Sequence, residues 1–370
     1  MAIIGGGLAG LTLAIQLANL KHKVVLFEKE QYPFHKVCGE YISLESWDFL
    51  QSLGVDLDTL NVSIITKLQV SSTNGNLLEQ FLPLGGFGIS RYVLDNKLAH
   101  LAKASGVVLL ENTKVNDVQF SDNEFSINAV KQYKAKAVAG SFGKRSNLDV
   151  KWKRPFILTA KNKLNNYVGI KYHIKADFPN DTIALHNFEN GYCGVVKIEQ
   201  DSYCLCYLTT AANLEKSNGN IKTMEENILA KNPLLQKIIT ESEKLYDTPL
   251  VISQIIFEKK SPIENHLLMV GDAAGMITPL CGNGMSMAMH GSKLAAIAID
   301  AFLKGTISRT QMEEQYTKQW NAQFGKRVKM GRRIQSLLGK GTITSLFIRL
   351  VKPFPAFINF LIRQTHGKPF

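Results

Sequence analysis

Cysteine is scarce in this sequence, and its spacing excludes two classes of fold. The chain has 370 residues, and its cysteines show neither the C-x-x-C…C-x-x-C spacing of a zinc site nor the regular framework of a small disulfide-rich domain. We therefore expect a reducing compartment, free thiols and no metal site. The five cysteines are Cys38, Cys193, Cys204, Cys206 and Cys281.

Long uninterrupted apolar runs are also missing. The most apolar stretch, residues 343–362, contains two basic residues and two prolines, whereas a membrane-spanning helix needs about 20 consecutive apolar residues. The first apolar run, Ala2 to Ile4, has no basic leader and passes directly into glycines, so we expect no signal peptide and a cytoplasmic protein. A central strand usually has about 5 or 6 residues, so either this strand is unusually short or a few residues precede Met1.

Acidic residues are absent from the last fifty positions. The formal net charge is +12, and residues 321–370 hold ten Lys or Arg and no Asp or Glu. Basic residues beside apolar aromatics suit an anionic membrane surface, such as the inner face of the cell membrane, or a lipid-like substrate. The alternative is a C-terminal helical pair packed on the main body with its basic face in water. No nucleic-acid recognition motif is present, so we do not expect nucleic acid as a partner.

The beginning of the chain reads as a strand, a glycine-rich turn, a helix and a second strand. In Gly5-Gly6-Gly7-Leu8-Ala9-Gly10, Gly5 permits the tight turn, Gly7 lets the backbone approach a pyrophosphate, and Gly10 lets the helix pack closely on the strands. Glu28 ends the second strand, where a carboxylate accepts hydrogen bonds from an adenosine ribose and repels a 2′-phosphate. This pattern predicts dinucleotide binding, with a fortuitous glycine-rich helix start as the alternative.

A second strand, glycine loop and helix lies far along the chain. A buried-strand pattern at 266–270 runs into Gly271-Asp272-Ala273-Ala274-Gly275, and a helical pattern begins near Gly284. Gly282 and Gly284 allow a close backbone approach, and the helix start that carries Met285 is a natural seat for a negative group such as a reduced flavin. An NAD dehydrogenase does not need this second loop, whereas FAD does. The alternative is that these glycines serve helix packing only.

With the segment Gly88 to Asp95, these motifs resemble the FAD-dependent class A monooxygenase superfamily, especially its geranylgeranyl-reductase-like and halogenase-like branches. The resemblance implies an α/β fold: a glutathione-reductase-type, Rossmann-like FAD domain with an inserted β-rich substrate domain and a helical C-terminal tail. It also implies FAD as cofactor, NAD(P)H as transient electron donor, and three cofactor contacts. These are Asp272 at the ribityl or pyrophosphate region, Arg91 near the cofactor, and the backbone of Val115, in a strand-like segment, at the adenine.

The segment Lys36-Val37-Cys38-Gly39-Glu40 resembles the K-x-C-G-G/E segment of the geranylgeranyl-reductase-like branch, whose cysteine lies close to the flavin ring. The resemblance makes Lys36 a cofactor contact and Cys38 a candidate catalytic residue. A role in lining the cofactor, or burial as a small hydrophobe, is the alternative for Cys38.

Two departures from the family stand out. Ser141-Phe142 stands where the family usually carries Asp-Gly, which puts the usual nicotinamide-docking geometry in doubt. The W-x-W-x-I signature of flavin halogenases is absent, and Gly191 to Val196 occupies the corresponding region. Halogenation is therefore not expected.

The domain organisation follows from the length and from the change of period. A chain of 41.1 kDa exceeds the size of a single growing core. Alternating patterns predict a hairpin with a type I′ turn at Asn74-Gly75 and four strands between 167 and 208. Residues 223–243 should be helical, and Val251 to Phe257 should return to the cofactor domain. The expected parts are 1–63, 84–150 and 251–320 for FAD, 64–83 and 151–250 for the substrate sheet, and 321–370 for the helical C-terminal segment.

The chemistry expected is flavin redox on an apolar small molecule. One version is NAD(P)H-driven hydroxylation of an aromatic or polyketide-like substrate. The second is hydride transfer to a carbon-carbon double bond of an isoprenoid or lipid, which the Cys38 segment and the apolar, basic tail favour. A flavin-binding protein without turnover is the third.

Overall fold

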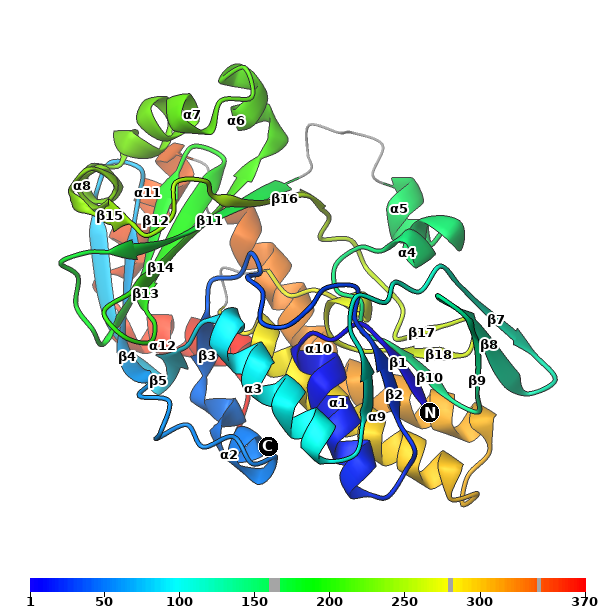
Figure 1. The fold of residues 1–370 in the computed structure, drawn as a ribbon. Helices are drawn as coiled ribbons and strands as arrows, with labels where there is room; N and C mark the ends of the chain where they lie inside the picture. The colour runs from blue at the N-terminus through cyan, green and yellow to red at the C-terminus, as the bar shows by residue number, and fades with distance from the viewer. Residues whose placement is uncertain (160–166, 279–281, 338–340) are drawn as a thin grey trace.

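The computed structural model describes residues 1–159, 167–278, 282–337 and 341–370, and it contains two large sheets (Figure 1). Among these residues, the six-stranded sheet has the order β17-β18-β10-β1-β2-β6. Its strands are β1 (Ala2–Ile4), β2 (Val25–Phe27), β6 (Val108–Leu110), β10 (Val138–Gly140), β17 (Ile263–Glu264) and β18 (Leu267–Met269).

The parallel centre of this sheet confirms the expected strand, turn and helix unit. β1 pairs in parallel with β2 and with β10, and β10 pairs in parallel with β18. These short strands are apolar and buried on both faces, as is typical of parallel sheets covered by helices. Because parallel strands end at the same edge, the two glycine loops that follow β1 and β18 lie at one edge of the sheet.

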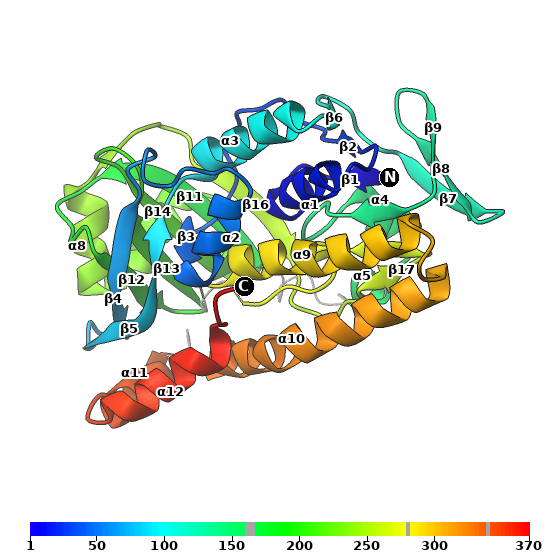
Figure 2. The same cartoon turned by 90° about the horizontal axis from the view of Figure 1, so that it is seen from below.

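Four helices cover this part of the molecule and appear in the order α3, α1, α9, α10 in Figure 2. Thr12 of α1 and Ser292 of α9 share a hydrogen bond of 2.7 Å between their hydroxyl oxygens. Alanine and glycine on the buried faces of both helices allow this close packing. The helices are α1 (Leu8–Asn19), α3 (Arg91–Ala104), α9 (Gly284–Leu303) and α10 (Arg309–Leu337).

The second sheet has nine strands in the order β15-β11-β14-β13-β12-β4-β5-β3, with β16 paired to β11. Its four central strands confirm the four strands expected between 167 and 208. The strands are β3 (Tyr41–Ser43), β4 (Ser63–Ser71), β5 (Leu77–Gly88), β11 (Tyr167–Lys175), β12 (Thr182–Phe188), β13 (Gly191–Lys197), β14 (Tyr203–Thr210), β15 (Glu243–Lys244) and β16 (Leu250–Ile255).

Two strand assignments made from the sequence are wrong. β16 was expected to return to the cofactor domain, but it pairs antiparallel with β11. Residues 41–43 and 84–88, expected in the cofactor part, belong to the nine-stranded sheet because β3 pairs with the end of β5. Local alternation identifies a strand, but the partner of an edge strand depends on contacts distant in sequence.

The hairpin of β4 and β5 is confirmed, but its turn type is not. Gly75 has a φ of +78°, whereas Asn74 is absent from the residues with positive φ, and a type I′ turn needs positive φ at both central positions. The Gly75 N–H instead donates to the Ser72 carbonyl at 3.0 Å, and the Ser72 N–H donates to Asn76 at 2.9 Å. The loop is therefore longer than the two-residue turn that Asn-Gly favours.

Smaller elements complete the fold. The helical prediction for 223–243 is interrupted at Asn232, whose side chain caps α8 and donates to Ser71 Oγ at 2.7 Å. A three-stranded sheet at one end of the molecule consists of β7 (Asp117–Ser121), β8 (Glu124–Asn128) and β9 (Gln132–Ala135). The short helices are η1 (Leu44–Ser46), α2 (Trp47–Ser52), α4 (Asn147–Lys151), α5 (Pro155–Thr159), α6 (Ala211–Lys216), α7 (Ile221–Asn227), η3 (Leu229–Lys231), α8 (Pro233–Glu241) and η4 (Gly271–Ala273).

The expected helical C-terminal segment is confirmed as α11 (Gly341–Val351) and α12 (Pro355–Thr365). Within the described ranges, no single helix is long and apolar enough to cross a membrane. The bent pair Thr344–Val351 and Pro355–Thr365, whose axes meet at 118°, passes that test together, on length and composition alone.

Candidate functional site

The first glycine loop joins β1 to α1 and has the geometry of a phosphate cradle. A Cβ at Gly10 would overlap the Gly5 carbonyl oxygen, and one at Gly5, whose φ is +104°, would lie 2.5 Å from the Ser141 carbonyl oxygen. Gly7 is the N-cap of α1 and leaves the first N–H groups of the helix without a side-chain cap. The loop is thus closed on its packing side and open, at the start of a helix, on the side where an anion binds.

Glu28 follows β2 and lies beside this loop. Its carboxylate is 6% exposed and accepts hydrogen bonds from Gly6 N at 2.7 Å and Glu30 N at 3.1 Å. The Tyr32 hydroxyl donates to the Gly6 carbonyl oxygen from the same side. A carboxylate has about four lone-pair sites, so Glu28 retains the capacity to accept ribose hydroxyls.

Lys36 and Arg91, both predicted cofactor contacts, meet at Asp95. Arg91, the first residue of α3, donates to Asp95 at 2.8 and 2.7 Å, and Lys36 Nζ donates to it at 2.8 Å. Burial would raise the pKa of Asp95, but Arg91 and Lys36 hold it below its ordinary value. Two cations and one carboxylate leave one net positive charge, and Arg91 Nη2 lies 3.7 Å from where a Cβ of Gly7 would be. This positive charge lies beside the first glycine loop, where the pyrophosphate of a dinucleotide would bind.

The second glycine loop ends at the start of α9. Gly271 and Gly282 both have a φ of +64°, which favours glycine. Asn283, the N-cap of α9, makes no side-chain cap, and the first turn holds no acidic residue. Pro279 and Cys281 of this loop lie outside the described residues. A 20-residue helix with an open N-terminus and Met285 in its first turn therefore faces the same edge as the first loop.

Buried cations fix the backbone around Asp272, and the sequence did not reveal them. Lys260 Nζ donates to the Asp272 carbonyl at 2.8 Å and to the Lys144 carbonyl at 2.7 Å, and Arg154 donates to the Ala273 carbonyl at 3.1 Å. Burial lowers the pKa of Lys260 to about 8. These bonds tie the second glycine loop to the 144–154 region. The Asp272 side chain itself is half-buried.

Ser141, which replaces an acid of the family pattern, binds the first glycine loop instead. Its hydroxyl donates to the Gly5 carbonyl at 2.6 Å, and its N–H donates to the Ile4 carbonyl at 2.8 Å. Phe142 contacts Trp152 in an edge-to-face pair with centroids 6.4 Å apart. This position therefore holds the loop in place and contributes no negative charge.

Cys38 lies between the two helix starts. Its Sγ is 3.5 Å from Met285 Sδ in the first turn of α9. Burial would lower the pKa of Arg91, but Asp95 and, after it, Cys38 raise this pKa. The Cys38 thiol therefore lies beside the Arg91 guanidinium as well. The structure thus brings Cys38, Arg91 and Met285 together, as expected for groups around one cofactor.

Glu40, missed by the sequence reading, anchors the Cys38 segment to the nine-stranded sheet. It pairs with Lys171 Nζ, lies 2.7 Å from His173 Nε2, and accepts from Arg91 N at 2.8 Å. Burial would raise the pKa of Glu40, but the His173 hydrogen bond and the Lys171 charge hold it below its ordinary value. Glu40, His173 and Cys204 offer three ligand atoms within 4.8 Å. Lys171 already pairs with the Glu40 carboxylate. Burial raises the pKa of the Cys204 thiol, so the thiolate that would bind a metal is disfavoured, and we assign no metal to this cluster.

The side of the sheet that meets the second glycine loop is apolar. Met276, which follows Asp272, packs with Tyr192, Leu208 and Ile255 in one buried cluster. Aromatic and aliphatic side chains of neighbouring strands pack against it: Tyr167, Leu185, Ile252 and Phe257. This apolar wall excludes water beside the loop.

Val115 is the predicted adenine contact, and it is buried in the connection between β6 and β7. It is 4% exposed, and its carbonyl accepts from Asn147 Nδ2 at 3.1 Å. The segment 113–115 is an irregular connection between β6 and β7 and not the expected strand. Thr113 N donates to the Glu28 carbonyl at 2.8 Å, which brings this connection alongside Glu28.

Known proteins share this architecture. Residues 3–37 match the family described as NAD(P)-binding Rossmann-like domain. Conditioned medium factor receptor 1 of Dictyostelium discoideum is 27% identical over 88% of this chain and 68% of its own length. Kynurenine 3-monooxygenase of Flavobacterium psychrophilum is 24% identical over 77% of this chain and 69% of its own length.

Solved structures show the same fold over the whole chain. A geranylgeranyl bacteriochlorophyll reductase-like protein of Thermoplasma acidophilum superposes with a TM-score of 0.80 and 16% identity, over 100% of this chain and 96% of the other. The flavin-dependent brominase Bmp2 gives 0.78 and 18% identity, over 98% and 92%. The chain is thus similar to proteins named as flavin-dependent enzymes, and it shares their fold.

Proposed function

We propose that this protein is an FAD-dependent oxidoreductase that uses NAD(P)H to hydroxylate an apolar aromatic or polyketide-like substrate. The observation that carries the cofactor is the pair of open helix N-termini, at α1 and α9, with Arg91 and Lys36 at the first. Bound FAD would accept a hydride from NAD(P)H and, once reduced, activate dioxygen.

The residues present fit FAD at both of its ends. The Gly5–Gly10 loop and Arg91 would hold the pyrophosphate, because a Cβ at Gly7 meets no atom closer than 3.7 Å. Glu28 would accept the ribose hydroxyls. The start of α9 around Gly284 would face the flavin carbonyls, because no side chain caps the first N–H groups of this helix.

The substrate would lie between the flavin end and the apolar wall of Met276, Tyr192, Leu208 and Ile255. These side chains orient a substrate through shape and contact, and they keep water away from the reacting atoms. Cys38 and Met285 would form the opposite edge, where the thiol is half-buried.

A second candidate is reduction of a carbon-carbon double bond, which the position of Cys38 favours. Bound FAD, once reduced, would supply a hydride for one carbon of the double bond, and the Cys38 thiol would give its proton to the other carbon. The thiolate that remains would lie beside the Arg91 guanidinium. The thiolate would then take up a proton from solvent and become a thiol again before the next turnover.

One experiment separates the two. Purified protein reconstituted with FAD is mixed with NADH or NADPH and with candidate phenols or isoprenoids, and oxygen uptake and product mass are measured. Hydroxylation consumes oxygen and adds one oxygen atom to the product. Double-bond reduction consumes no oxygen and adds two hydrogen atoms. A protein that gains no flavin absorbance on reconstitution would refute both.

The Cys38→Ser variant refines the test. Under the reductase candidate, it keeps flavin reduction by NAD(P)H and loses at least tenfold in product formation, since serine is a far weaker proton donor. Cys206→Ser is the matched control, because Cys206 is another half-buried thiol close to Cys38. Equal product formation by both variants and the parent would leave hydroxylation as the proposed function.

A further inference from the structure

The C-terminal elbow, which comprises α11, α12 and the connection Lys352–Phe354, projects from the end of α10 (Figure 2). Its two helices meet at 118°. Their inner sides pack on the β4–β5 hairpin through Ile348, Val351 and Ile358, which are 2%, 9% and 6% exposed and contact Leu78. This packing accounts for one apolar side of each helix.

The elbow also has an apolar outer side. Leu346, Leu350 and Phe354 follow one another at intervals of four residues and are 58%, 60% and 62% exposed. Phe357 and Phe360 on α12 are 46% and 53% exposed, and their rings lie 6.4 Å apart. A helix with apolar residues on two sides needs a second apolar neighbour, and a group of five exposed large side chains is typical of a membrane or protein contact.

The charges around the elbow indicate which kind of surface it contacts. Arg349 on α11, Lys352 in the connection and Arg363 on α12 are exposed, and residues 321–370 contain no Asp or Glu. A patch with exposed aromatics and only positive charge is complementary to an anionic lipid surface, where aromatic side chains insert at headgroup depth and cations meet the phosphates. A second copy of this chain would bring the same positive charges together.

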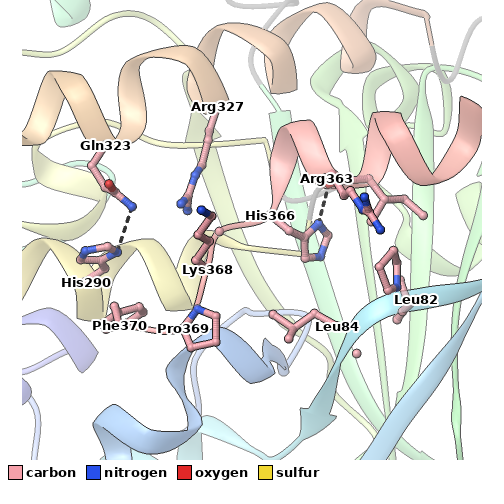
Figure 3. A pocket seen from close by; sticks show the side chains of 14 residues that line it. Leu82, Leu84, His290, Gln323, Arg327, Arg363, His366, Lys368, Pro369 and Phe370 are labelled. Carbon is pink, nitrogen blue, oxygen red and sulfur yellow. Dashed lines mark hydrogen bonds between the residues drawn. The ribbon is translucent and has the colours of Figure 1, made fainter.

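A cavity of about 940 Å³ opens at the end of α12 (Figure 3). Its cationic lining comes from Arg327 of α10, Arg363 of α12 and Lys368, and its apolar lining includes Leu82 and Leu84 of β5. His366 also lines it. His366 Nδ1 bonds the Ile362 carbonyl at 3.0 Å, and its Nε2 is buried without a hydrogen-bond partner in the described part of the chain. The cavity therefore offers positive charge, one acceptor for a hydroxyl group and an apolar strip.

We propose that the elbow rests on a bilayer that contains anionic phospholipid, with its outer aromatic side in the interface, and that the cavity receives an anionic lipid headgroup. The proposal is independent of the reaction catalysed. It gives the protein access to apolar substrates dissolved in the membrane.

The test is sedimentation of the full-length protein with vesicles of phosphatidylcholine, alone or mixed with phosphatidylglycerol. We expect binding to the mixed vesicles only. Phe354→Glu and Phe357→Glu should each weaken it by at least tenfold, about 1.4 kcal/mol. Arg349→Gln and Lys352→Gln should each weaken it by about fivefold at low salt. Arg363→Gln with Lys368→Gln should lower the preference for phosphatidylglycerol.

Matched controls lie at the opposite end of the molecule, in the turn between β8 and β9. Val130 is 84% exposed, and Lys131 is exposed beside it, so Val130→Glu and Lys131→Gln should bind vesicles as the parent does. Circular dichroism of every variant checks the fold. The proposal is overturned if the parent does not sediment with mixed vesicles, or if the controls weaken binding as much as the elbow variants. It is also overturned if the parent is a dimer that Phe354→Glu dissociates and that does not bind vesicles.

Discussion

The buried carboxylate of Glu45 destabilises the folded state in a pH-dependent way, and replacing this carboxylate by a neutral group should stabilise the protein. The side chain lies in η1 and is 1% exposed, and its carboxylate lies beside the Gly367 N–H and the side chains of Ser286 and Asn283 at the start of α9. Arg327 Nη1, 3.5 Å away, is the cation that faces it. Burial raises the pKa of Glu45 to about 7, against the attraction of Arg327. The Glu45→Gln variant keeps the shape and removes the charge.

The sign and size follow from linkage. Because the folded-state pKa is raised, the folded protein binds more protons than the unfolded chain between about pH 4.5 and pH 7, so stability falls as pH rises through this window. A rise from an ordinary value of about 4.3 to about 7 corresponds to roughly 3 to 4 kcal/mol. We expect about 2 kcal/mol for Glu45→Gln, because the variant still buries a polar amide at this position.

Thermal unfolding monitored by circular dichroism measures this gain. With an unfolding entropy of about 2.1 cal/mol/K per residue, about 2 kcal/mol raises the Tm of a 370-residue chain by roughly 2.5 °C. The rise should be present at pH 8 and absent at pH 4.5, where the parent carboxyl is protonated. Glu226→Gln, at an exposed position, should change neither value. A variant less stable than the parent at pH 8, or equally stabilised at both pH values, would refute the reasoning.

Two further predictions concern the cofactor side. Gly7→Ala should fold normally, because its Cβ has room in the fold, but it should weaken FAD binding by at least tenfold in a flavin-fluorescence titration, because this Cβ stands where the pyrophosphate approaches. Gly10→Ala should instead fail to fold, since its Cβ would overlap the Gly5 carbonyl. Asp95→Asn should cost about 3 kcal/mol in urea unfolding at pH 7, because it leaves Arg91 and Lys36 without their carboxylate. This loss should shrink as pH falls through the lowered pKa of Asp95, and Asp201→Asn, whose side chain is fully exposed, should be neutral. Normal flavin affinity in Gly7→Ala, or a pH-independent loss in Asp95→Asn, would contradict these expectations.

The fold could be predicted where local pattern and chemistry coincide. The glycine loop after β1, the carboxylate at the end of β2 and the second loop before α9 each combine a strand, a turn and a helix within a few residues, so their geometry is set locally. The pairing partner of each strand was harder to predict from the sequence. β16 reads as a strand but pairs with β11, more than seventy residues earlier, and a strand pattern carries no information about its neighbour. The type I′ turn predicted at Asn74-Gly75 was wrong, because Asn74 does not adopt a positive φ and the hydrogen bond between Ser72 and Asn76 closes a longer loop.

The candidate site shows the same division. The resemblance named Lys36, Cys38 and Arg91, and the structure brings them together. The resemblance did not name Glu40 as the partner of Lys171 and His173, because those residues come from a strand 131 and 133 positions later in the chain. Lys260 was missed as well, since a lysine in a loop gives no sign of burial until the loop is packed.

The parallel pairing of β1, β10 and β18 also fixes when this site can form during synthesis. Residues 2–4 must wait for residues 138–140 and then for 267–269 before the sheet is complete. At about 5 to 20 residues per second, the wait is roughly 15 to 50 s. During this time the first glycine loop is already translated but has no second loop opposite it. We therefore expect the nascent chain to acquire its cofactor late, after α9 has been translated, and N-terminal fragments that end before α9 to hold at most one half of it.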